Sequence, residues 1–316
     1  MSGRIGTAFV MGAGLGTRLK PLTDKCPKPL IPIYGKPLIT FALDHLRASG
    51  VQNFVINTHH LAGQFEEAFT DGVYAGCPVR LVYEPILLET GGGIKNAEPW
   101  LGRDPFLVYS GDILTDLDLD ALIDEHYRQG NDVTMALRET GLAAGVALEN
   151  GRVVDIRNKH GRGGGYDFAN VSIWNPTAFA RIPAAKTSFV PVLMEWMAQG
   201  GRIGGIVLNE RDWFNVGSRT EYLGVHRAIA EKSWKPAYIP EPQWPLKASP
   251  DAVVAPSAQT KGFYSIGPGC VVGDCAVVED SILWPGANVA SDTHLRGCIA
   301  MGSLVISGLH DNVDFW

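Results

Sequence analysis

The sequence predicts an α/β fold with a mostly parallel, Rossmann-like sheet, followed by a short left-handed parallel β-helix. Short apolar runs alternate with helical spacing up to about residue 232, as in a parallel sheet covered by helices on both faces. Residues 233–250 then carry five prolines and two tryptophans, and beyond them apolar residues recur every six positions. We therefore expect a first domain at residues 1–232, a linker at 233–250 and a repeat domain at 251–316.

The first domain begins with well-separated apolar runs. Strands are predicted at residues 7–11, 53–57, 79–83, 106–110 and 132–137, and helices at 38–49, 61–69 and 118–129. In the last of these helices, Asp118 is the expected N-cap, and one face carries Leu119, Leu122, Ile123 and His126. Ligands of such sheets bind at the carboxyl ends of the strands, so the site is expected in the loops that follow them.

From Ala143 the pattern changes to short strands at residues 145–148, 153–156 and 169–174. The glycine-rich stretch at 161–165 is either a mobile lid or an ordinary hairpin connection. A further helix follows with a core-facing stripe at Val190, Leu193, Met194 and Met197.

The six-residue period of the tail is typical of a parallel β-helix, in which stacked coils bury the repeated apolar position. Turns are expected at Pro268-Gly269 and Pro285-Gly286, with about three coils of eighteen residues each. The alternative is an irregular edge of a β-sandwich. The repeated position is occupied by Val254, Thr260, Ile266, Val272, Val278, Trp284 and Ala290.

Composition excludes several classes of protein. The net charge is −6, so no basic excess favours nucleic acid, and no apolar run is long enough to cross a membrane. The N-terminal apolar run is too short for a signal peptide. Five scattered cysteines without a C-x-x-C pair indicate reduced thiols and a cytoplasmic protein.

A glycine-rich segment follows the first strand and runs Met11-Gly12-Ala13-Gly14-Leu15-Gly16-Thr17-Arg18-Leu19-Lys20-Pro21-Leu22-Thr23. Three alternate glycines let backbone N–H groups approach phosphate oxygens, and Arg18 adds a fixed cation. The spacing is neither that of a P-loop nor that of the dinucleotide fingerprint. The segment is interpreted as an anion cradle, although glycines spaced in this way can also serve a structural turn.

The run Cys26-Pro27-Lys28-Pro29-Leu30 places a lysine between two prolines, which gives it a rigid local backbone. Together, the two segments resemble the signature of the sugar-1-phosphate nucleotidyltransferases, G-x-G-T-R-L-x-P-L-T followed by P-K-P-L. The resemblance implies the nucleotide-diphospho-sugar transferase fold and a nucleotide-binding role for the first segment, with Arg18 and Lys28 on the reacting phosphates. The residues assigned to the nucleotide phosphates are Gly12, Ala13, Gly14, Gly16, Thr17 and Arg18.

A second glycine cluster, Glu89-Thr90-Gly91-Gly92-Gly93, follows the third strand. Bare backbone before a helix can lie against a flat ring, although a tight strand-to-helix turn explains the glycines equally well. The family lines the nucleobase with a similar segment, which makes Gly91 and Gly92 candidates for base contact. Glu84 falls where a base-reading side chain is expected, and its carboxylate can accept from guanine or from uracil N3.

Asp112 ends an apolar strand in the pair Gly111-Asp112, where a carboxylate can hold Mg²⁺. In the family this aspartate is a metal ligand, and the resemblance assigns that role to Asp112. The second ligand is expected in Trp213-Phe214-Asn215-Val216-Gly217-Ser218, which resembles W-x-D-[VI]-G-T with Asn215 in place of aspartate. An amide oxygen can still bind Mg²⁺ without contributing charge.

Two further positions follow from the resemblance. Lys159 matches the lysine that holds the sugar phosphate in the segment E-K-P, although the flanking Glu and Pro are absent here. Asn170 lies in the sugar-contacting segment, at a position where the family more often has glycine.

The implied reaction is in-line attack of a sugar-1-phosphate on the α-phosphorus of a nucleoside triphosphate, with pyrophosphate as the leaving group. Positioning and charge neutralisation by Arg18, Lys28 and Mg²⁺ on Asp112 would dominate catalysis. GTP or UTP is expected, with a mannose-1-phosphate guanylyltransferase-like activity favoured over an N-acetylmuramate-1-phosphate uridylyltransferase-like one. An inactive nucleotide-sugar-sensing subunit remains an alternative, and the repeat tail is expected to form homo-oligomer contacts.

Overall fold

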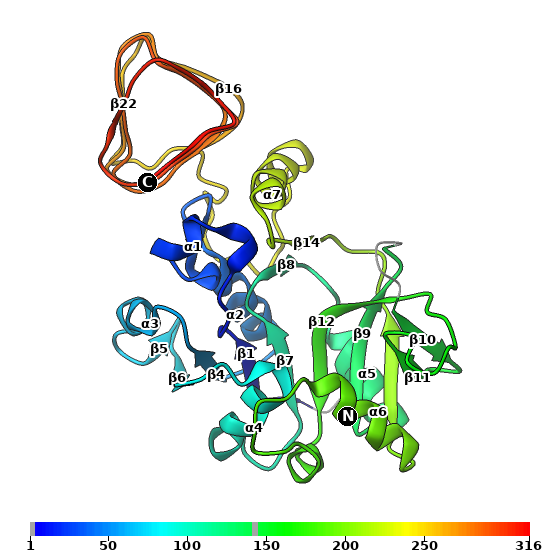
Figure 1. Ribbon diagram of the computed structural model, residues 1–316. Helices are drawn as coiled ribbons and strands as arrows, with labels where there is room; N and C mark the ends of the chain where they lie inside the picture. The colour runs from blue at the N-terminus through cyan, green and yellow to red at the C-terminus, as the bar shows by residue number, and fades with distance from the viewer. Residues whose placement is uncertain (1–3, 141–144) are drawn as a thin grey trace. The chain divides into compact units, whose positions relative to one another are not determined.

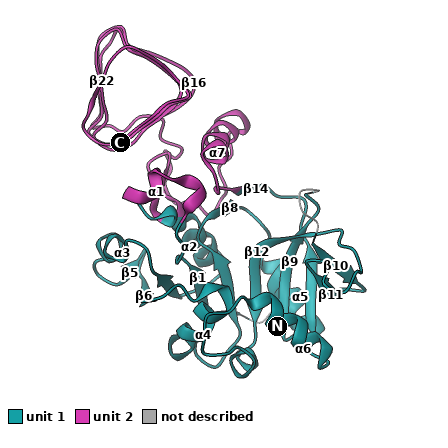
Figure 2. Ribbon diagram, in the orientation of Figure 1, with its two compact units in different colours: residues 1–15, 26–29, 39–214 teal, residues 16–25, 30–38, 215–316 magenta. Residues whose placement is uncertain are grey.

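A computed structural model of the 316-residue chain describes residues 4–140 and 145–316. Ala143, where the sequence pattern changes, lies outside the described residues. The chain forms two compact units (Figure 2). The first unit contains Met1–Leu15, Cys26–Pro29 and Ile39–Phe214, and the second unit contains Gly16–Lys25, Leu30–Leu38 and Asn215–Trp316. The predicted division at residues 232 and 250 stays a prediction.

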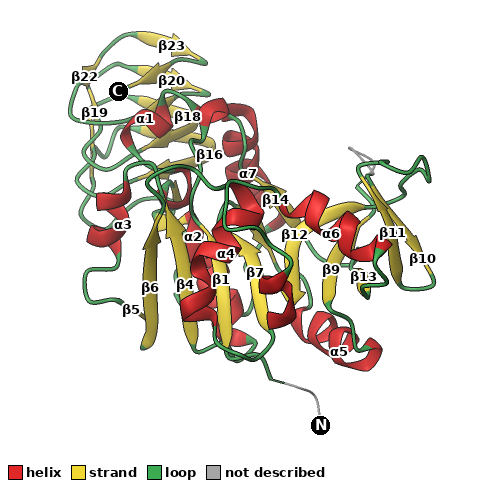
Figure 3. Cartoon of the chain, turned by 60° about the horizontal axis from the view of Figure 1, so that its bottom comes forward, coloured by secondary structure: helices red, strands yellow, loops and turns green. Residues whose placement is uncertain are grey.

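The first unit is built on one ten-stranded sheet in the order β10-β11-β13-β9-β12-β7-β1-β4-β6-β5. Its middle is parallel: β1 pairs in parallel with β4 and β7, β4 with β6, and β9 with β13. Strand β12 runs antiparallel between β7 and β9. Figure 3 shows β6, β4, β1 and β7 side by side. The strands are β1 (Thr7–Met11), β4 (Asn53–Thr58), β5 (Val73–Tyr74), β6 (Cys77–Tyr83), β7 (Phe106–Ser110), β9 (Val133–Arg138), β10 (Val146–Glu149), β11 (Arg152–Ile156), β12 (Asp167–Trp174) and β13 (Ile203–Val207).

Helices cover both faces of this sheet, because alternate residues of its buried strands are apolar on both sides. On one face, Val108 and Met135 pack in a core cluster with Ile94 of α4 (Glu89–Leu101) and Leu193 of α6 (Phe189–Ala198). Their neighbours along the strands meet the other helices: Tyr109 OH lies 3.2 Å from His45 Nδ1 of α2 (Leu38–Ala48), and Thr134 Oγ1 lies 2.9 Å from His126 Nδ1 of α5 (Leu119–Gln129). The predicted α/β class is confirmed.

The predicted elements agree closely where periodicity was strong. The strands at 7–11 and 106–110 have the predicted bounds, and α5 begins after Asp118, whose side chain accepts from Ala121 N. The 161–165 stretch connects β11 to β12. Before the repeat tail, the elements without a prediction are β5, β13, α7 (Arg219–Lys232) and several other short ones: η1 (Thr17–Leu19), α1 (Leu22–Lys25), η2 (Lys28–Leu30), β2 (Pro32–Ile33), β3 (Lys36–Pro37), β8 (Ile113–Thr115), η3 (Pro176–Ala180) and β14 (Trp213–Asn215). The predicted helix at 61–69 is α3 (Ala62–Ala68).

The second unit contains a parallel β-helix, seen down its axis as a triangle of superposed coils in Figure 1. Buried valines, leucines and small residues such as Cys270 and Ala276 fill it. Its strands are β15 (Val253–Val254), β16 (Gln259–Ile266), β17 (Val271–Val272), β18 (Val277–Leu283), β19 (Asn288–Val289), β20 (His294–Arg296), β21 (Ile299–Ala300), β22 (Val305–Ile306), β23 (Leu309–Asp311) and β24 (Asp314–Phe315).

The coil length differs from the predicted eighteen residues. Val253 aligns with Val271, eighteen residues on, but Val271 aligns with Asn288 and Asn288 with Val305, seventeen residues on each time. The residue is lost at the register shift where Lys261 pairs with Glu279 but Tyr264 pairs with Ser281. From there on Leu283 pairs with Ile266, and the buried position moves from the predicted Ala290 to Val289, which is 1% exposed. Gly269 and Gly286 take positive φ of 65° and 79° at the predicted turns. These two turns need glycine because a side chain there would be strained.

Within the second unit, His226 of α7 is fully buried and joins several segments. Tyr34 N donates to His226 Nε2 at 3.3 Å, and His226 Nδ1 lies 3.0 Å from Tyr222 O. The Tyr34 and Tyr222 rings lie 4.8 and 4.9 Å from the imidazole. Nε2 accepts a hydrogen bond, so the ring must be neutral, and burial lowers the pKa of His226 to about 4.

We expect the free energy of unfolding to fall as the pH drops from 6.5 to 4. The unfolded chain protonates His226 near its usual value of 6.5 and the folded protein only near 4, so the unfolded state binds more protons in that window. The loss is about 3 kcal/mol for this one group, and His45, whose pKa burial also lowers to about 4, adds a similar loss. Urea unfolding at pH 7 and pH 4.5 measures the effect; His226→Gln should flatten the profile, and an unchanged slope would contradict it.

Candidate functional site

At the carboxyl ends of β1 and β7, Lys28 and Asp112 form an ion pair. Lys28 Nζ lies 2.5 Å from Asp112 Oδ2, and Ser110 Oγ donates to Asp112 Oδ1 at 2.6 Å. The lysine side chain is 11% exposed and the aspartate 31%. The geometry brings together two of the predicted residues, 84 positions apart in the sequence, and leaves the carboxylate partly open to solvent.

The three glycines of the first segment differ in what the fold requires of them. A Cβ at Gly12 would lie 2.7 Å from Asn57 O, so packing requires glycine there. Gly16 takes φ 59° at the start of η1, where its carbonyl accepts from Leu19 N. At Gly14, no atom of the described chain lies within 4 Å of an added Cβ. Protein packing therefore does not require glycine at position 14.

Sequence reasoning missed Asn57, the second-last residue of β4, beside the glycine segment. Its Oδ1 accepts from Gly12 N at 2.9 Å and from Ala13 N at 3.3 Å. Its Nδ2 donates to Glu84 Oε1 at 2.7 Å, while Glu84 Oε2 accepts from Leu88 N at 2.9 Å. A polar residue at the end of an apolar strand was the available signal, because the same rule identified Asp112.

Glu84 does not present its carboxylate to a ligand as predicted. Its side chain is fully buried, and protein N–H groups donate to both oxygens. The physical reason is that the carboxylate accepts from Asn57 Nδ2 and from the N–H of Leu88, the residue before α4.

The triple glycine also differs from its interpretation as bare backbone before a helix. All three glycines lie inside the first turns of α4. Both Gly91 N and Gly92 N donate to Thr187 O, at 2.8 and 2.9 Å, and a Cβ at Gly92 would lie 2.6 Å from Ala185 O. Close packing of α4 against segment 185–189 accounts for these two glycines, and their contact with a base stays a prediction.

Lys159 lies in an exposed loop that a buried carboxylate holds. Asp155 accepts from Lys159 N and His160 N, both at 2.8 Å, and from Arg162 N at 3.2 Å. Burial alone would raise the pKa of Asp155, but the three N–H donors lower it below its usual range. The backbone that carries Lys159 is therefore fixed although its side chain is exposed.

Asn170 has a local structural explanation. It takes φ 62° where the register between β12 and β9 shifts, between Phe168 and Ser172. Glycine and asparagine are the residues that best tolerate this left-handed conformation. Asparagine is therefore compatible with the backbone at this position, and contact of Asn170 with the sugar stays a prediction.

In the second unit, Arg18, Asn215 and Glu221 surround Gly217. A Cβ at Gly217 would lie 2.8 Å from Arg18 Nη2, 2.8 Å from Asn215 Nδ2 and 2.9 Å from Glu221 Oε2. Asn215 Nδ2 donates to Glu221 Oε1 at 2.8 Å, and Gly217 N and Ser218 Oγ donate to Glu221 Oε2. Burial alone would raise the pKa of Glu221, but these bonds, with the Arg18 charge, lower it.

Sequence reasoning missed Glu221, although a signal was present. Ser218-Arg219-Thr220-Glu221 has the S-x-x-E spacing of a capping box, and Ser218 is the N-cap of α7. In the structure Glu221 reaches back to Gly217 N and Ser218 Oγ. Because Glu221 accepts from the amide of Asn215, it leaves the Asn215 oxygen as the end available to a cation. An aspartate at position 215 would instead place two carboxylates in contact.

The donors fit a hard divalent cation only in part. The described residues contain no group of three His, Cys, Asp or Glu side chains arranged to hold a metal. Mg²⁺ is commonly held by one or two carboxylates plus substrate phosphates, and the partly exposed carboxylate of Asp112 fits this use. Asp112 and Asn215 belong to different units, so their pairing on one ion stays a prediction.

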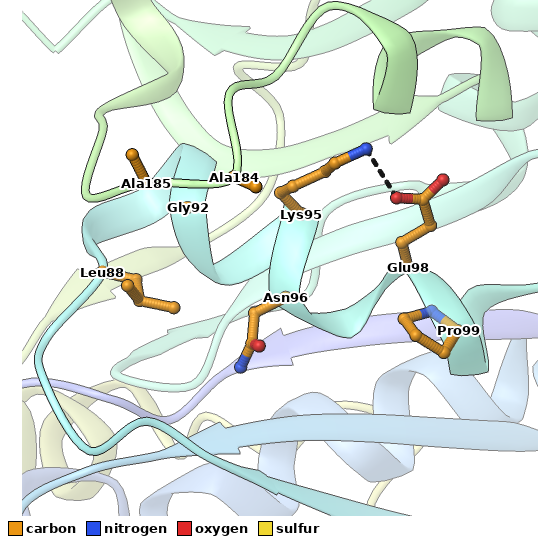
Figure 4. Close-up of a pocket in the computed structure, with 8 residues that line it drawn as sticks. All are labelled: Leu88, Gly92, Lys95, Asn96, Glu98, Pro99, Ala184 and Ala185. Carbon is orange, nitrogen blue, oxygen red and sulfur yellow. Dashed lines mark ion pairs between the residues drawn. The ribbon is translucent and has the colours of Figure 1, made fainter.

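A groove of about 370 Å³ lies elsewhere in the first unit, between α4 and the segment that contains Ala184 and Ala185 (Figure 4). Lys95 and Glu98 form an ion pair of 2.6 Å on its wall. Gly92 is the only predicted site residue among those that line this groove. No helix among the described residues has the length and apolar character that crossing a bilayer requires.

Comparison with known proteins adds independent information. Residues 7–232 match the family described as nucleotidyl transferase. The chain is 36% identical over 224 residues to an N-acetylmuramate alpha-1-phosphate uridylyltransferase from Neisseria meningitidis, covering 67% of this chain and 93% of that protein. It is 39% identical over 134 residues to a mannose-1-phosphate guanylyltransferase from Mycobacterium tuberculosis, covering 42% of this chain and 37% of that protein.

A solved structure shows the same fold. The inositol-1-phosphate CTP transferase from T. maritima superposes with a TM-score of 0.59 at 16% identity, covering 70% of this chain and 93% of that chain.

Proposed function

Because the chain belongs to the nucleotidyl transferase family, we propose that it transfers a nucleotidyl group from a nucleoside triphosphate to a sugar-1-phosphate and releases pyrophosphate. The observation that carries the site is the Lys28–Asp112 ion pair of 2.5 Å. It places one cation and one carboxylate at the strand ends, where ligands of parallel sheets bind. Nucleotidyl transfer needs no nucleophilic side chain, so the expected catalytic groups are charged side chains held in fixed positions.

The residues of this chain would share the work as follows. Gly12, Ala13 and Gly14 would place backbone beside the triphosphate, with the N–H groups of Gly12 and Ala13 held by Asn57 Oδ1 and the space around Gly14 open. Arg18 and Lys28 would offset the charge that builds on the leaving pyrophosphate and on the α-phosphate. The other predicted phosphate contacts are Gly16 and Thr17. Contact with the base is proposed for Gly91 and Gly92, and contact with the sugar phosphate for Lys159 and Asn170.

Mg²⁺ is the proposed cofactor, with Asp112 as one ligand and the amide oxygen of Asn215 as the second. The ion would supply charge neutralisation on the phosphates when bound. Asp112 is oriented for this use by Ser110, and Asn215 by Glu221.

We propose GTP with mannose-1-phosphate as the preferred pair, supported by the partial match to a guanylyltransferase. UTP with N-acetylmuramate-1-phosphate is the second candidate, favoured by the match that covers 93% of a uridylyltransferase. A cytoplasmic location is part of the proposal and is supported by the five free cysteines.

The tail is proposed as a hexapeptide-repeat element that forms homo-oligomer contacts. One outer face of the β-helix carries exposed Val253, Val271 and Val305 at the same register position, with Asn288 on the coil between the last two. Exposed valines gathered on one face favour contact with another protein surface.

One assay tests the activity and the substrates together. Four triphosphates are combined with a panel of sugar-1-phosphates, with and without Mg²⁺, and pyrophosphate release is measured. We expect one triphosphate and one sugar phosphate to exceed the others by at least about tenfold in kcat/KM, and EDTA to abolish release. Binding of a nucleotide sugar without any pyrophosphate release would instead favour the sensing-subunit alternative.

A further inference from the structure

We infer that Asn57 and Glu84 form a positioning pair that sets the backbone of the phosphate-binding segment. The pair connects two segments that the sequence places far apart. Asn57 accepts from Gly12 N and Ala13 N, and Glu84 accepts from Leu88 N at the start of α4. The inference rests on the proposed function, because it assigns this pair to the segment that would hold the triphosphate.

The chemistry of the two side chains fixes the direction of every bond. An asparagine amide has one accepting and one donating end, and a carboxylate only accepts. Glu84 Oε1, 2.7 Å from Asn57, therefore holds the NH₂ group on its own side. The Asn57 oxygen is thereby directed to Gly12 N and Ala13 N, which need an acceptor. A flipped amide would place its NH₂ group against these N–H donors.

A separate observation shows that the chain makes room for this pair. A Cβ at Gly93 would lie 2.9 Å from Asn57 Nδ2 and 3.0 Å from Glu84 Oε1. Asn57 is 4% exposed and Glu84 is fully buried. The third glycine of the cluster on α4 is thus explained by the pair, whereas the first two are explained by segment 185–189.

Burial makes the pair sensitive to the loss of either partner. A buried donor or acceptor without a partner is costly, so the backbone moves to regain a bond. The donors that would lose their acceptor are Gly12 N and Ala13 N, in the segment Gly12–Gly14, which carries no side chain larger than that of Ala13. Both residues would act through this turn and touch no substrate, so they are positioning residues.

The test exchanges the two functional groups. Asn57→Asp alone places two carboxylates in contact, and Glu84→Gln alone leaves either Asn57 Nδ2 or Leu88 N without an acceptor. In the double variant Asn57→Asp/Glu84→Gln, the new carboxylate accepts from Gly12 N, Ala13 N and the NH₂ group of the new amide. The oxygen of that amide accepts from Leu88 N. Every bond is restored with the net charge unchanged.

Binding of GTP, UTP and inorganic pyrophosphate is measured by calorimetry, together with KM for the sugar phosphate and the melting temperature. We expect each single variant to weaken pyrophosphate and both triphosphates at least tenfold, with the sugar-phosphate KM within threefold. The double variant should return to within threefold of the wild type. Asn131→Ala, which removes another buried amide of the first unit, controls for general destabilisation and should leave pyrophosphate binding unchanged.

Three results would overturn the inference: single variants that only lower the melting temperature, a double variant no better than the singles, or Glu84→Gln changing the preference between GTP and UTP while pyrophosphate binding stays normal. The last result would return Glu84 to base recognition. Failure of the wild type to bind pyrophosphate or any triphosphate would instead reject the proposed function, which keeps the two failures distinct.

Discussion

Lys28→Ala and Asp112→Ala are each expected to lower kcat by about a hundred- to a thousand-fold, the usual effect of removing one preorganised charge from a transition state. The residues form an ion pair of 2.5 Å with partly exposed side chains. Because Lys28 is only 11% exposed, loss of one partner should cost about 1–3 kcal/mol of folding stability, more than for a surface pair. Pyrophosphate release and thermal unfolding, measured on the same samples, separate the two effects.

The double variant Lys28→Ala/Asp112→Ala sharpens this prediction. Without an unpaired charge, its stability should recover toward that of the wild type, while its turnover should remain as low as in the worse single variant. Lys95→Ala is the matched control, because it removes another ion-paired lysine of the first unit. Turnover near the wild-type rate in either single variant would refute the assignment of this pair to the reaction.

Gly217→Ala is expected to lower kcat/KM by at least about a hundred-fold, because displacements near 1 Å can cost that much in a positioned site. The new methyl group would meet Arg18, Asn215 and Glu221, all within 2.9 Å. All three must shift together, and two of them are proposed to bind phosphate and metal. Steady-state kinetics over a range of Mg²⁺ concentrations should show a raised requirement for the ion.

Gly224→Ala provides the control for this substitution within the same unit. Gly224 lies in α7, and no described atom comes within 4 Å of a Cβ placed there. Alanine should stabilise the helix by up to about 1 kcal/mol and leave the kinetics unchanged. Equal kinetics for Gly217→Ala and Gly224→Ala would show that the cluster around Gly217 has no part in the reaction.

The sequence predicted most of the fold, because periodicity and turn residues are local properties. The parallel sheet, α5 with its Asp118 cap and the β-helix are all confirmed. The change from eighteen- to seventeen-residue coils lies between Glu279 and Ser281. It escaped prediction because the next two core positions each offer two adjacent apolar residues, Leu283 with Trp284 and Val289 with Ala290, and a six-residue period does not show which one faces the axis.

The candidate site was predicted less completely, for a different reason. Gly12, Lys28 and Asp112 belong to motifs that can be read along the chain. The hydrogen-bond partners of Asn57 and Glu84 cannot be identified along the sequence. They come from the segment after β1 and from the start of α4, which meet β4 only in the folded chain. The same holds for the glycines of α4, whose neighbours come from segment 185–189, nearly a hundred residues away, as the bond from Phe189 N to Thr90 Oγ1 illustrates.

The division of the chain between the two units has a consequence for its synthesis. Residues 16–25 and 30–38 leave the ribosome early, yet they belong to the second unit, whose remaining residues are Asn215–Trp316. His226, the hydrogen-bond partner of Tyr34, lies 192 residues later in the sequence. At usual rates of translation it is synthesised about 10–40 s after Tyr34. The segment that carries Arg18 therefore completes its unit only after the last third of the chain has emerged, and chaperones that bind nascent chains would meet it in an unfinished state.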